Sequence, residues 1–306
     1  MSDFAALLSE LHALDQQYPL PRDAQTEVQI LYLRRSAAQA VVAHPESDSP
    51  AGDLVETSTE HAEPPQPELP TLQAASLSAD ALAGAFRSGG GALVRGFLDA
   101  DEISMLRDQL RADQSETPES RESIAEYGCS PAATNLLVKV FHEKGFTELL
   151  CDYFQDQPLM VAERTKLRRR IRGRDNFAVI PWHQDVNFFG HRVGGLGVWC
   201  ALEEVGEDVH GLSVVPHRFT DRIGWSGEGH APLNYGKTTG AAEIEQVIGQ
   251  YGKVTPVLNP GDAILLDEMT LHATAPRPWT AEEQLVAISW FFPASRFPRN
   301  GTPLAL

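Results

Sequence analysis

Hydrophobic positions recur every three to four residues in two segments near the start of the chain. The first pattern covers residues 3–15 and the second covers residues 23–42, with Pro19 and Pro21 breaking the chain between them. This spacing is typical of amphipathic helices. We therefore predict a helical appendage over residues 1–43, which is too short to build a hydrophobic core of its own.

The pattern changes over residues 44–75, where Pro, Glu, Asp, Ser and Thr dominate and aromatic residues are almost absent. Such a composition buries too little apolar surface to order the chain. We interpret this segment as an acidic, Pro-rich, disordered linker and place the main domain over residues 76–306. The helical appendage before the linker either packs on the main domain or mediates self-association or docking of a partner.

In the main domain, helix starts are indicated at Ser78 and Asp99, and a further helix is predicted over residues 146–154. Residues 115–144 show no clear pattern. Most of the remaining chain reads as strands, which we expect at residues 92–97, 159–171, 177–181, 196–202, 211–216, 254–258, 262–266 and 285–292. Many short strands with Gly and Pro between them indicate a mainly β fold with flanking helices, a β-sandwich or jelly roll.

Composition narrows the classes of partner. The net charge of -17 disfavours both nucleic acid and anionic membranes, because basic surfaces bind them. Three cysteines without paired spacing argue against a disulfide framework or a zinc knuckle. The N-terminus lacks a basic stretch leading into an apolar run, and no run of about 18 apolar residues occurs. We expect a cytoplasmic protein whose partners include neither nucleic acid nor a membrane.

Three side chains form a candidate metal site. His183 and Asp185 lie two residues apart, so in an extended segment both point to the same face. His272 follows much later, at the end of the strand predicted over residues 262–266. Two imidazoles and one carboxylate are the ligands of a non-haem Fe(II) centre. An isolated His-x-Asp pair arises often by chance, but here an aromatic residue, Trp182, precedes it and the context is rich in strands.

Four blocks of sequence, over residues 181–190, 197–202, 211–216 and 261–272, together resemble the phytanoyl-CoA dioxygenase family. The resemblance covers about residues 77 to 296. It implies a double-stranded β-helix, which is a jelly-roll, cupin-like core. It also implies an enzyme that requires Fe(II), 2-oxoglutarate as a cosubstrate and O2.

Carried over to this sequence, the resemblance implies that His183, Asp185 and His272 bind the iron and that Trp199 is a wall of the cosubstrate pocket. It implies no catalytic residue beyond the metal ligands. Related halogenases have Ala or Gly at the position of Asp185, so the carboxylate favours hydroxylation or another oxidation of an unactivated C–H bond without halide.

The sequence departs from the family at one position. Family members have an Arg about a dozen residues after the second His, where it pairs with the distal carboxylate of 2-oxoglutarate, but this chain has Gln284. A neutral amide cannot replace the charge-assisted pair. Two candidates for the missing cation are Arg277, which follows His272 in a loop, and Arg169, whose neighbours Leu167 and Ile171 suggest an inward face.

The substrate is not specified by the sequence. Phe188, Trp225 and Lys237 are candidate substrate contacts, and the basic run at residues 164–172 favours an anion. Two alternatives remain open: an Fe(II) oxygenase that uses no 2-oxoglutarate or another keto acid, and a catalytically silent jelly-roll protein that keeps a metal.

Overall fold

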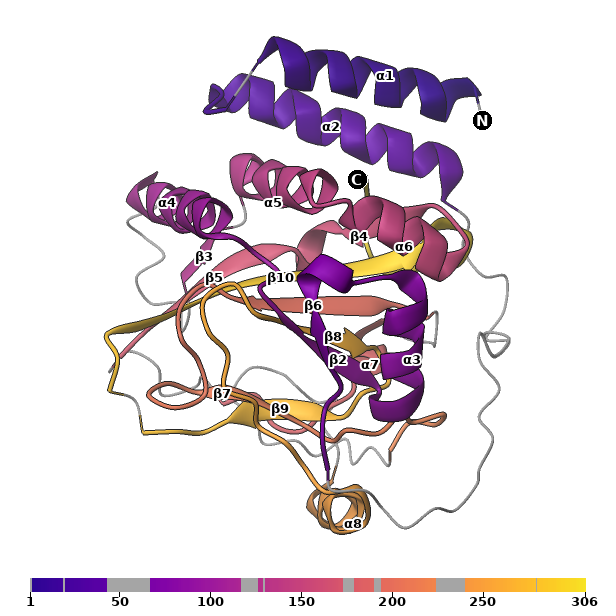
Figure 1. Cartoon of the computed structure of the whole chain (residues 1–306). Helices are drawn as coiled ribbons and strands as arrows, with labels where there is room; N and C mark the ends of the chain where they lie inside the picture. The colour runs from indigo at the N-terminus through magenta and orange to yellow at the C-terminus, as the bar shows by residue number, and fades with distance from the viewer. Residues whose placement is uncertain are drawn as a thin grey trace.

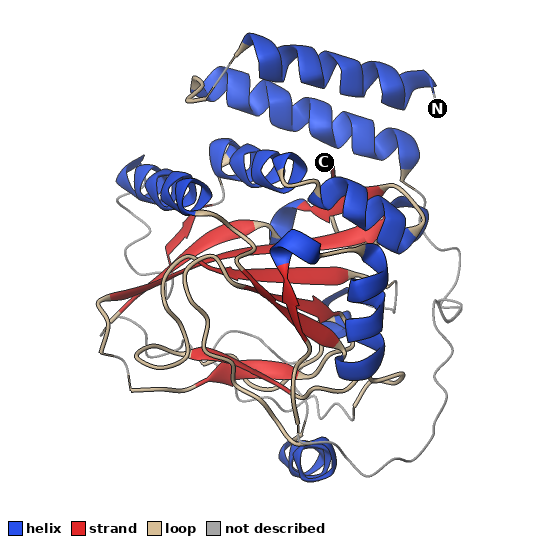
Figure 2. Ribbon diagram, viewed as in Figure 1, coloured by secondary structure: helices blue, strands red, loops and turns tan. Residues whose placement is uncertain are grey.

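A computed structural model describes residues 2–18, 20–42, 67–116, 126–128, 130–172, 179–189, 194–223, 240–278 and 280–306. The elements stack in layers, which run in Figure 1 from an N-terminal helical hairpin through a row of helices and a large sheet to a small sheet. The large sheet carries helices on its outer face and turns its inner face toward the small sheet (Figure 2). This is the predicted mainly β fold with flanking helices.

The helices follow the capping signals in the sequence. Ser78, Asp23 and Ser130 each accept a hydrogen bond from a backbone N–H in the first turn of a helix, which satisfies a donor that the helix itself leaves open. The helices are α1 (Ser2–Gln17), α2 (Ala24–Val41), α3 (Ala79–Gly89), α4 (Ala100–Glu116), α5 (Pro131–Glu143), α6 (Phe146–Phe154), α7 (Val186–Phe189) and α8 (Ala241–Tyr251). In the described part of the chain, no helix has the length and apolar character that crossing a bilayer requires.

The described strands form a nine-stranded and a two-stranded sheet. They are β1 (Thr71–Gln73), β2 (Gly91–Arg95), β3 (Glu126–Gly128), β4 (Pro158–Val161), β5 (Lys166–Ile171), β6 (Leu196–Ala201), β7 (Gly211–Val214), β8 (Ala263–Asp267), β9 (His272–Ala275), β10 (Glu283–Pro293) and β11 (Pro303–Ala305). The large sheet runs β1-β2-β8-β6-β10-β4-β11, and β5 pairs with the first half of β10 and with β3. Strands β7 and β9 form the small sheet.

The two faces of the large sheet are buried in different ways. Leu167, Leu265 and Phe291 belong to a core that also contains residues of α3, α4, α5 and α6. The opposite face contributes Trp199 and Val286 to a second core that includes residues of β7. Because side chains alternate along a strand, the even-numbered residues of β5 and β10 face the interior between the sheets.

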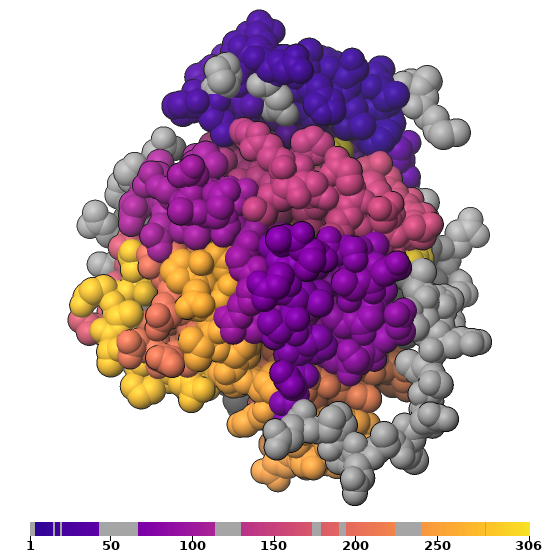
Figure 3. All heavy atoms as spheres, in the orientation of Figure 1, coloured from indigo at the N-terminus to yellow at the C-terminus, as the bar shows by residue number. Residues whose placement is uncertain are grey.

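The N-terminal hairpin packs on the main domain. In Figure 3 it covers the outer surface of the helices that lie on the large sheet. Asn135 of α5 is buried beneath α2, where its amide nitrogen donates to the backbone oxygen of Glu27 at 2.9 Å and to the Glu27 carboxylate at 2.7 Å. Its amide oxygen accepts from Arg34 Nε at 3.3 Å. A buried polar network of this kind orders the hairpin against the main domain.

Several predicted boundaries need correction. Residues 67–75 were assigned to the linker, but Leu69 is buried and Thr71–Gln73 form β1, which pairs with β2. The remainder of the predicted linker, residues 44–66, lies outside the described residues. The strand expected at residues 159–171 is split into β4 and β5 by a short 3-10 helix, Ala162–Arg164.

Other elements were missed or shortened. The unassigned region at 115–144 contains α5, and residues 254–258 form isolated bridges through Val254 and Leu258 instead of a strand. The described part of the segment expected at 177–181, which starts at residue 179, is not a strand. His272 does not end the strand that precedes it, because it opens β9 in the other sheet.

Candidate metal centre and cosubstrate cavity

His183, Asp185 and His272 come together at the inner face of the small sheet. Asp185 Oδ1 lies 3.4 Å from His183 Nε2, and its Oδ2 lies 3.8 Å from His272 Nε2. One ligand atom from each of the three residues can be chosen so that all lie within 4.8 Å of one another. Three donors this close can bind a single ion, and two imidazoles with one carboxylate suit Fe(II).

The backbone fixes which imidazole nitrogen faces the site. His183 Nδ1 lies 2.8 Å from the carbonyl oxygen of Pro181, and His272 Nδ1 lies 3.0 Å from that of Thr270. A carbonyl oxygen only accepts, so each Nδ1 carries the proton and donates it. Both Nε2 atoms therefore keep a free lone pair, as metal ligands require.

Local pairing holds the ligands in register. His183 and His272 form an antiparallel bridge in which each backbone N–H donates to the other's carbonyl oxygen at 3.0 Å. Gln184, between the two ligands of the His-x-Asp pair, is fully buried and points away from them. Its amide donates to Met269 O at 2.7 Å and accepts from Ile223 N at 2.8 Å. The Gln184 amide thus fixes the segment that presents His183 and Asp185.

The protonation states also suit metal binding. Burial raises the pKa of the Asp185 carboxyl, but its interactions with His183, His272 and Arg164 outweigh burial and lower the pKa to about 2. Burial, and next the neighbouring His183, lower the pKa of His272 to about 4. At neutral pH the carboxylate is ionised and His272 is neutral, and both are the forms that coordinate a cation.

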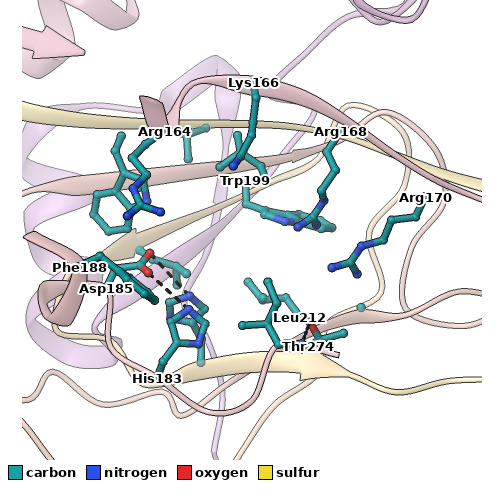
Figure 4. A pocket seen from close by; sticks show the side chains of 18 of the residues that line it. Arg164, Lys166, Arg168, Arg170, His183, Asp185, Phe188, Trp199, Leu212 and Thr274 are labelled. Atoms are coloured by element: carbon teal, nitrogen blue, oxygen red, sulfur yellow. Dashed lines mark hydrogen bonds and ion pairs between the residues drawn. The ribbon is translucent and has the colours of Figure 1, made fainter. Parts of the chain in front are cut away.

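The three residues open into a cavity between the sheets (Figure 4). One wall is cationic and consists of side chains from β5 and the turn before it: Arg164, Lys166, Arg168 and Arg170. Trp199 of β6 and Ile288 of β10 continue this face of the large sheet with apolar side chains, and Leu212 of β7 faces them from the small sheet. Thr274, two residues after His272 on β9, adds a hydroxyl group that accepts from Ile180 N at 3.0 Å.

Two of the predicted cosubstrate residues do not reach this cavity. Arg169 lies on the outer face of β5, where its Nε is 2.6 Å from Glu283 Oε2. Arg277 is exposed, and its Nε donates to Gly206 O at 3.0 Å. The inward assignment of Arg169 is wrong because helices cover the outer face of the sheet, so Leu167 is buried without facing the interior between the sheets.

The other predicted residues have different placements. Trp199 and Phe188 line the cavity, and the Phe188 ring stands edge-on to that of His183 with centroids 5.6 Å apart. Gln284 also lines the cavity and is buried. Trp225 and Lys237 lie outside the described residues.

The inward assignment of Arg169 put Lys166, Arg168 and Arg170 on the opposite face of the strand, either as a solvated edge or as cations that attract an anion, and the structure places these three in the cavity. A usable signal was present, because three cations at alternate positions of a strand must share one face. Thr274 was missed, although its position two residues after a metal ligand places it on the same face as His272.

Comparisons with known proteins agree with this fold. Among solved structures, the non-heme alpha ketoglutarate dependent epimerase SnoN from nogalamycin biosynthesis superposes with a TM-score of 0.54 at 18% identity, over 70% of this chain and 83% of that chain. EctD from S. alaskensis with 2-oxoglutarate and 5-hydroxyectoine gives a TM-score of 0.54 at 17% identity, over 75% and 86%. At these identities the likeness concerns the fold, and it confirms the jelly-roll prediction. The search of curated proteins found no match.

A His, Asp, His cluster inside a jelly roll defines the class of non-haem iron oxygenases that depend on 2-oxoglutarate, and this chain is an enzyme of that class. The family model described as phytanoyl-CoA dioxygenase (PhyH) matches residues 86–277. The chain belongs to the phytanoyl-CoA dioxygenase family.

Proposed function

We propose that the enzyme binds Fe(II) at His183, Asp185 and His272 and oxidises an unactivated C–H bond of a small organic anion, with 2-oxoglutarate as the cosubstrate. The observation that carries this proposal is the juxtaposition of the three ligands with a cavity that has one cationic wall. Both a keto acid and an anionic substrate would be attracted into such a space.

The residues present fit the metal. Two Nε2 lone pairs and an ionised carboxylate converge from one side, which leaves the side facing the cavity open. When bound there, Fe(II) with 2-oxoglutarate and O2 would supply the oxidising power for cleaving the C–H bond. The protein contributes fixed ligands, a largely apolar enclosure and orientation of the substrate.

The ligand set also restricts the reaction. Asp185 occupies the position that would otherwise admit a halide, so we propose hydroxylation or another oxidation without halogenation. One structural neighbour is named an epimerase and another was solved with 5-hydroxyectoine. Oxidation at carbon without net hydroxylation is therefore the second reaction type to test.

The charge of the cavity favours an anionic substrate. Four cations and one carboxylate line it, so with neutral histidines its formal charge is plus three. Fe(II) and the dianion of 2-oxoglutarate carry charges of equal size and opposite sign, so binding of both leaves the formal charge of the cavity unchanged. A substrate carboxylate, sulfate or phosphate group would reduce it, which stabilises the loaded cavity.

Arg164 and Phe188 form the part of the cavity where we place the substrate. The Arg164 guanidinium lies over the Phe188 ring, 5.0 Å from its centroid, and it lowers the pKa of Asp185 after the two histidines. In Figure 4 both side chains lie beside Asp185, on the opposite side of the cavity from Arg170. An anionic substrate held by Arg164 would thus present carbon near the metal ligands.

Formation of succinate tests the proposal. Purified enzyme would receive Fe(II), ascorbate and 2-oxoglutarate, with candidate metabolites supplied as pairs of a free acid and its methyl ester. We expect acids to stimulate succinate formation more than their esters do. Oxygen consumption that does not require 2-oxoglutarate would favour the alternative Fe(II) oxygenase. Normal metal binding with neither product nor oxygen consumption would favour a silent metal-binding protein.

A further inference from the structure

Gln284 occupies the position where family members have an Arg, and its amide is engaged with the protein. The Gln284 side chain is 1% exposed, and its Nε2 donates to the backbone oxygen of His210. Its Oε1 is buried and has no hydrogen-bond partner among the described residues. A neutral amide directed at a backbone carbonyl supplies no charge for a carboxylate.

Arg170 lies directly opposite Gln284 in the sheet. Strands β5 and β10 are antiparallel, and Arg170 and Gln284 are paired in their register. Arg170 is 4% exposed, lines the cavity, and lowers the pKa of the His210 imidazole, second to the effect of burial. The buried Arg170 guanidinium therefore lies on the strand next to position 284, where other family members have an Arg.

Arg170, Gln284 and His210 lie at a distance from the metal ligands that 2-oxoglutarate can span. Thr274 follows His272 by two residues on β9, which corresponds to about 7 Å along a strand. Leu212 pairs with Thr274, and His210, which accepts from Gln284, immediately precedes β7. Figure 4 shows Arg170 pointing into the cavity on the side of Leu212 and Thr274, away from Asp185 and Phe188. A five-carbon dicarboxylate that begins at the metal would end near this group.

We propose that Arg170 binds the distal carboxylate of 2-oxoglutarate, so that the cation supplied by the last long strand in other family members comes from β5 in this enzyme. This inference rests on the proposed function. Lys166 and Arg168 are paired with Ile288 and Val286, further along β10 from Gln284. Arg170 is thus the cation of the wall that stands beside position 284.

The test compares two keto acids of equal length. Dissociation constants of 2-oxoglutarate and of 2-oxopentanoate, which lacks the distal carboxylate, would be measured by calorimetry on the Mn(II)-loaded full chain. Charge-assisted hydrogen bonds contribute enough for Arg170→Gln to weaken 2-oxoglutarate about 10- to 100-fold. Binding of 2-oxopentanoate should change by less than about 3-fold. The matched control is Arg169→Gln, which removes a guanidinium from the outer face of the same strand and should change neither constant.

A second pair of variants guards against simple misfolding. Arg170→Lys keeps a charge without the planar fork and should bind 2-oxoglutarate with an affinity between those of wild type and Arg170→Gln. Adding Gln284→Arg to Arg170→Gln returns a cation to β10 and should restore most of the lost affinity. Mn(II) affinity should stay the same in all variants.

The outcomes separate the two proposals. Equal 2-oxoglutarate affinity in wild type and Arg170→Gln would overturn this inference and leave the proposed function standing. A loss that appears for Arg168→Gln but not for Arg170→Gln would also overturn it. If the metal-loaded wild type does not bind 2-oxoglutarate, both proposals fail.

Discussion

The contact between the N-terminal helices and the oxygenase core includes one buried amide, the side chain of Asn135. It is 1% exposed and makes three hydrogen bonds with α2, two through its nitrogen to Glu27 and one through its oxygen from Arg34. Glu27 and Arg34 are themselves 2% and 3% exposed. Replacing Asn135 by Ala would leave a buried carboxylate and a buried guanidinium with fewer partners.

The expected loss follows from these contacts. Hydrogen bonds to charged groups contribute about 1.5–3 kcal/mol each, and removal of one member of a buried charged network costs about 3–5 kcal/mol. Arg34 keeps a bond to Ala305 O, and Glu27 keeps Arg22 at 3.8 Å. We therefore expect Asn135→Ala to lower the free energy of unfolding by about 3 kcal/mol.

Urea denaturation followed by circular dichroism measures this loss, and limited trypsin digestion shows whether α2 separates first. Separation would expose Arg34 to cleavage before the core unfolds. Tyr32→Ala, on the exposed face of α2, is the control and should stay within about 0.5 kcal/mol of wild type. A loss below about 1 kcal/mol with no faster cleavage at Arg34 would show that the Asn135 hydrogen bonds do not hold α2 on the core.

Docking of α2 also bears on the site. Ala37 and Ala38 of α2 share a hydrophobic cluster with Phe189 and Trp290, and the latter two line the cavity. Separation of the hairpin in Asn135→Ala should therefore weaken the binding of 2-oxoglutarate in addition to lowering the free energy of unfolding.

Three further predictions concern the cavity and its surroundings. A Cβ on Gly197 would lie 2.6 Å from Trp290 Cζ2, so Gly197→Ala should lower the free energy of unfolding by about 1–3 kcal/mol, as measured by thermal unfolding. The control is Gly249→Ala in α8, where a Cβ meets nothing within 4 Å, and it should not destabilise the protein. Asp185→Asn removes the anionic ligand and should weaken Mn(II) at least about 100-fold in equilibrium dialysis, and unchanged affinity would place the metal elsewhere. Burial raises the pKa of both the Cys151 and the Cys200 thiols, but Cys200 is 1% exposed whereas Cys151 is only half-buried. Iodoacetamide at pH 8 followed by peptide mapping should therefore label Cys151 and leave Cys200 unmodified until the chain unfolds.

The clustering of His183, Asp185 and His272 could be predicted because the signal is local. His183 and Asp185 are two residues apart, and the blocks around them and around His272 keep their order along the chain. Likewise, Ser78 and Asp99 mark helix starts through their side chains, and the structure has α3 and α4 begin immediately after them. Such elements depend on near neighbours and can be read from sequence.

The cosubstrate end of the cavity could not be predicted because its geometry depends on distant pairing. Arg169 faces outward because Glu283 lies beside it on β10 and because α-helices cover that face. In a sheet covered on both faces, an apolar neighbour such as Leu167 does not distinguish the helix side from the cavity side. Only the register of β5 with β10 shows that Arg170 stands opposite Gln284.

Anaerobic titration of the Fe(II)-loaded chain with 2-oxoglutarate tests the central claim most directly, because a keto acid chelated to Fe(II) gives a visible absorption band that neither component has alone. With iron at His183, Asp185 and His272, we expect a band that saturates at one equivalent of 2-oxoglutarate per chain and is lost in Asp185→Asn. No band in the wild type, or an equal band in Asp185→Asn, would contradict the assignment of His183, Asp185 and His272 as the site of the iron.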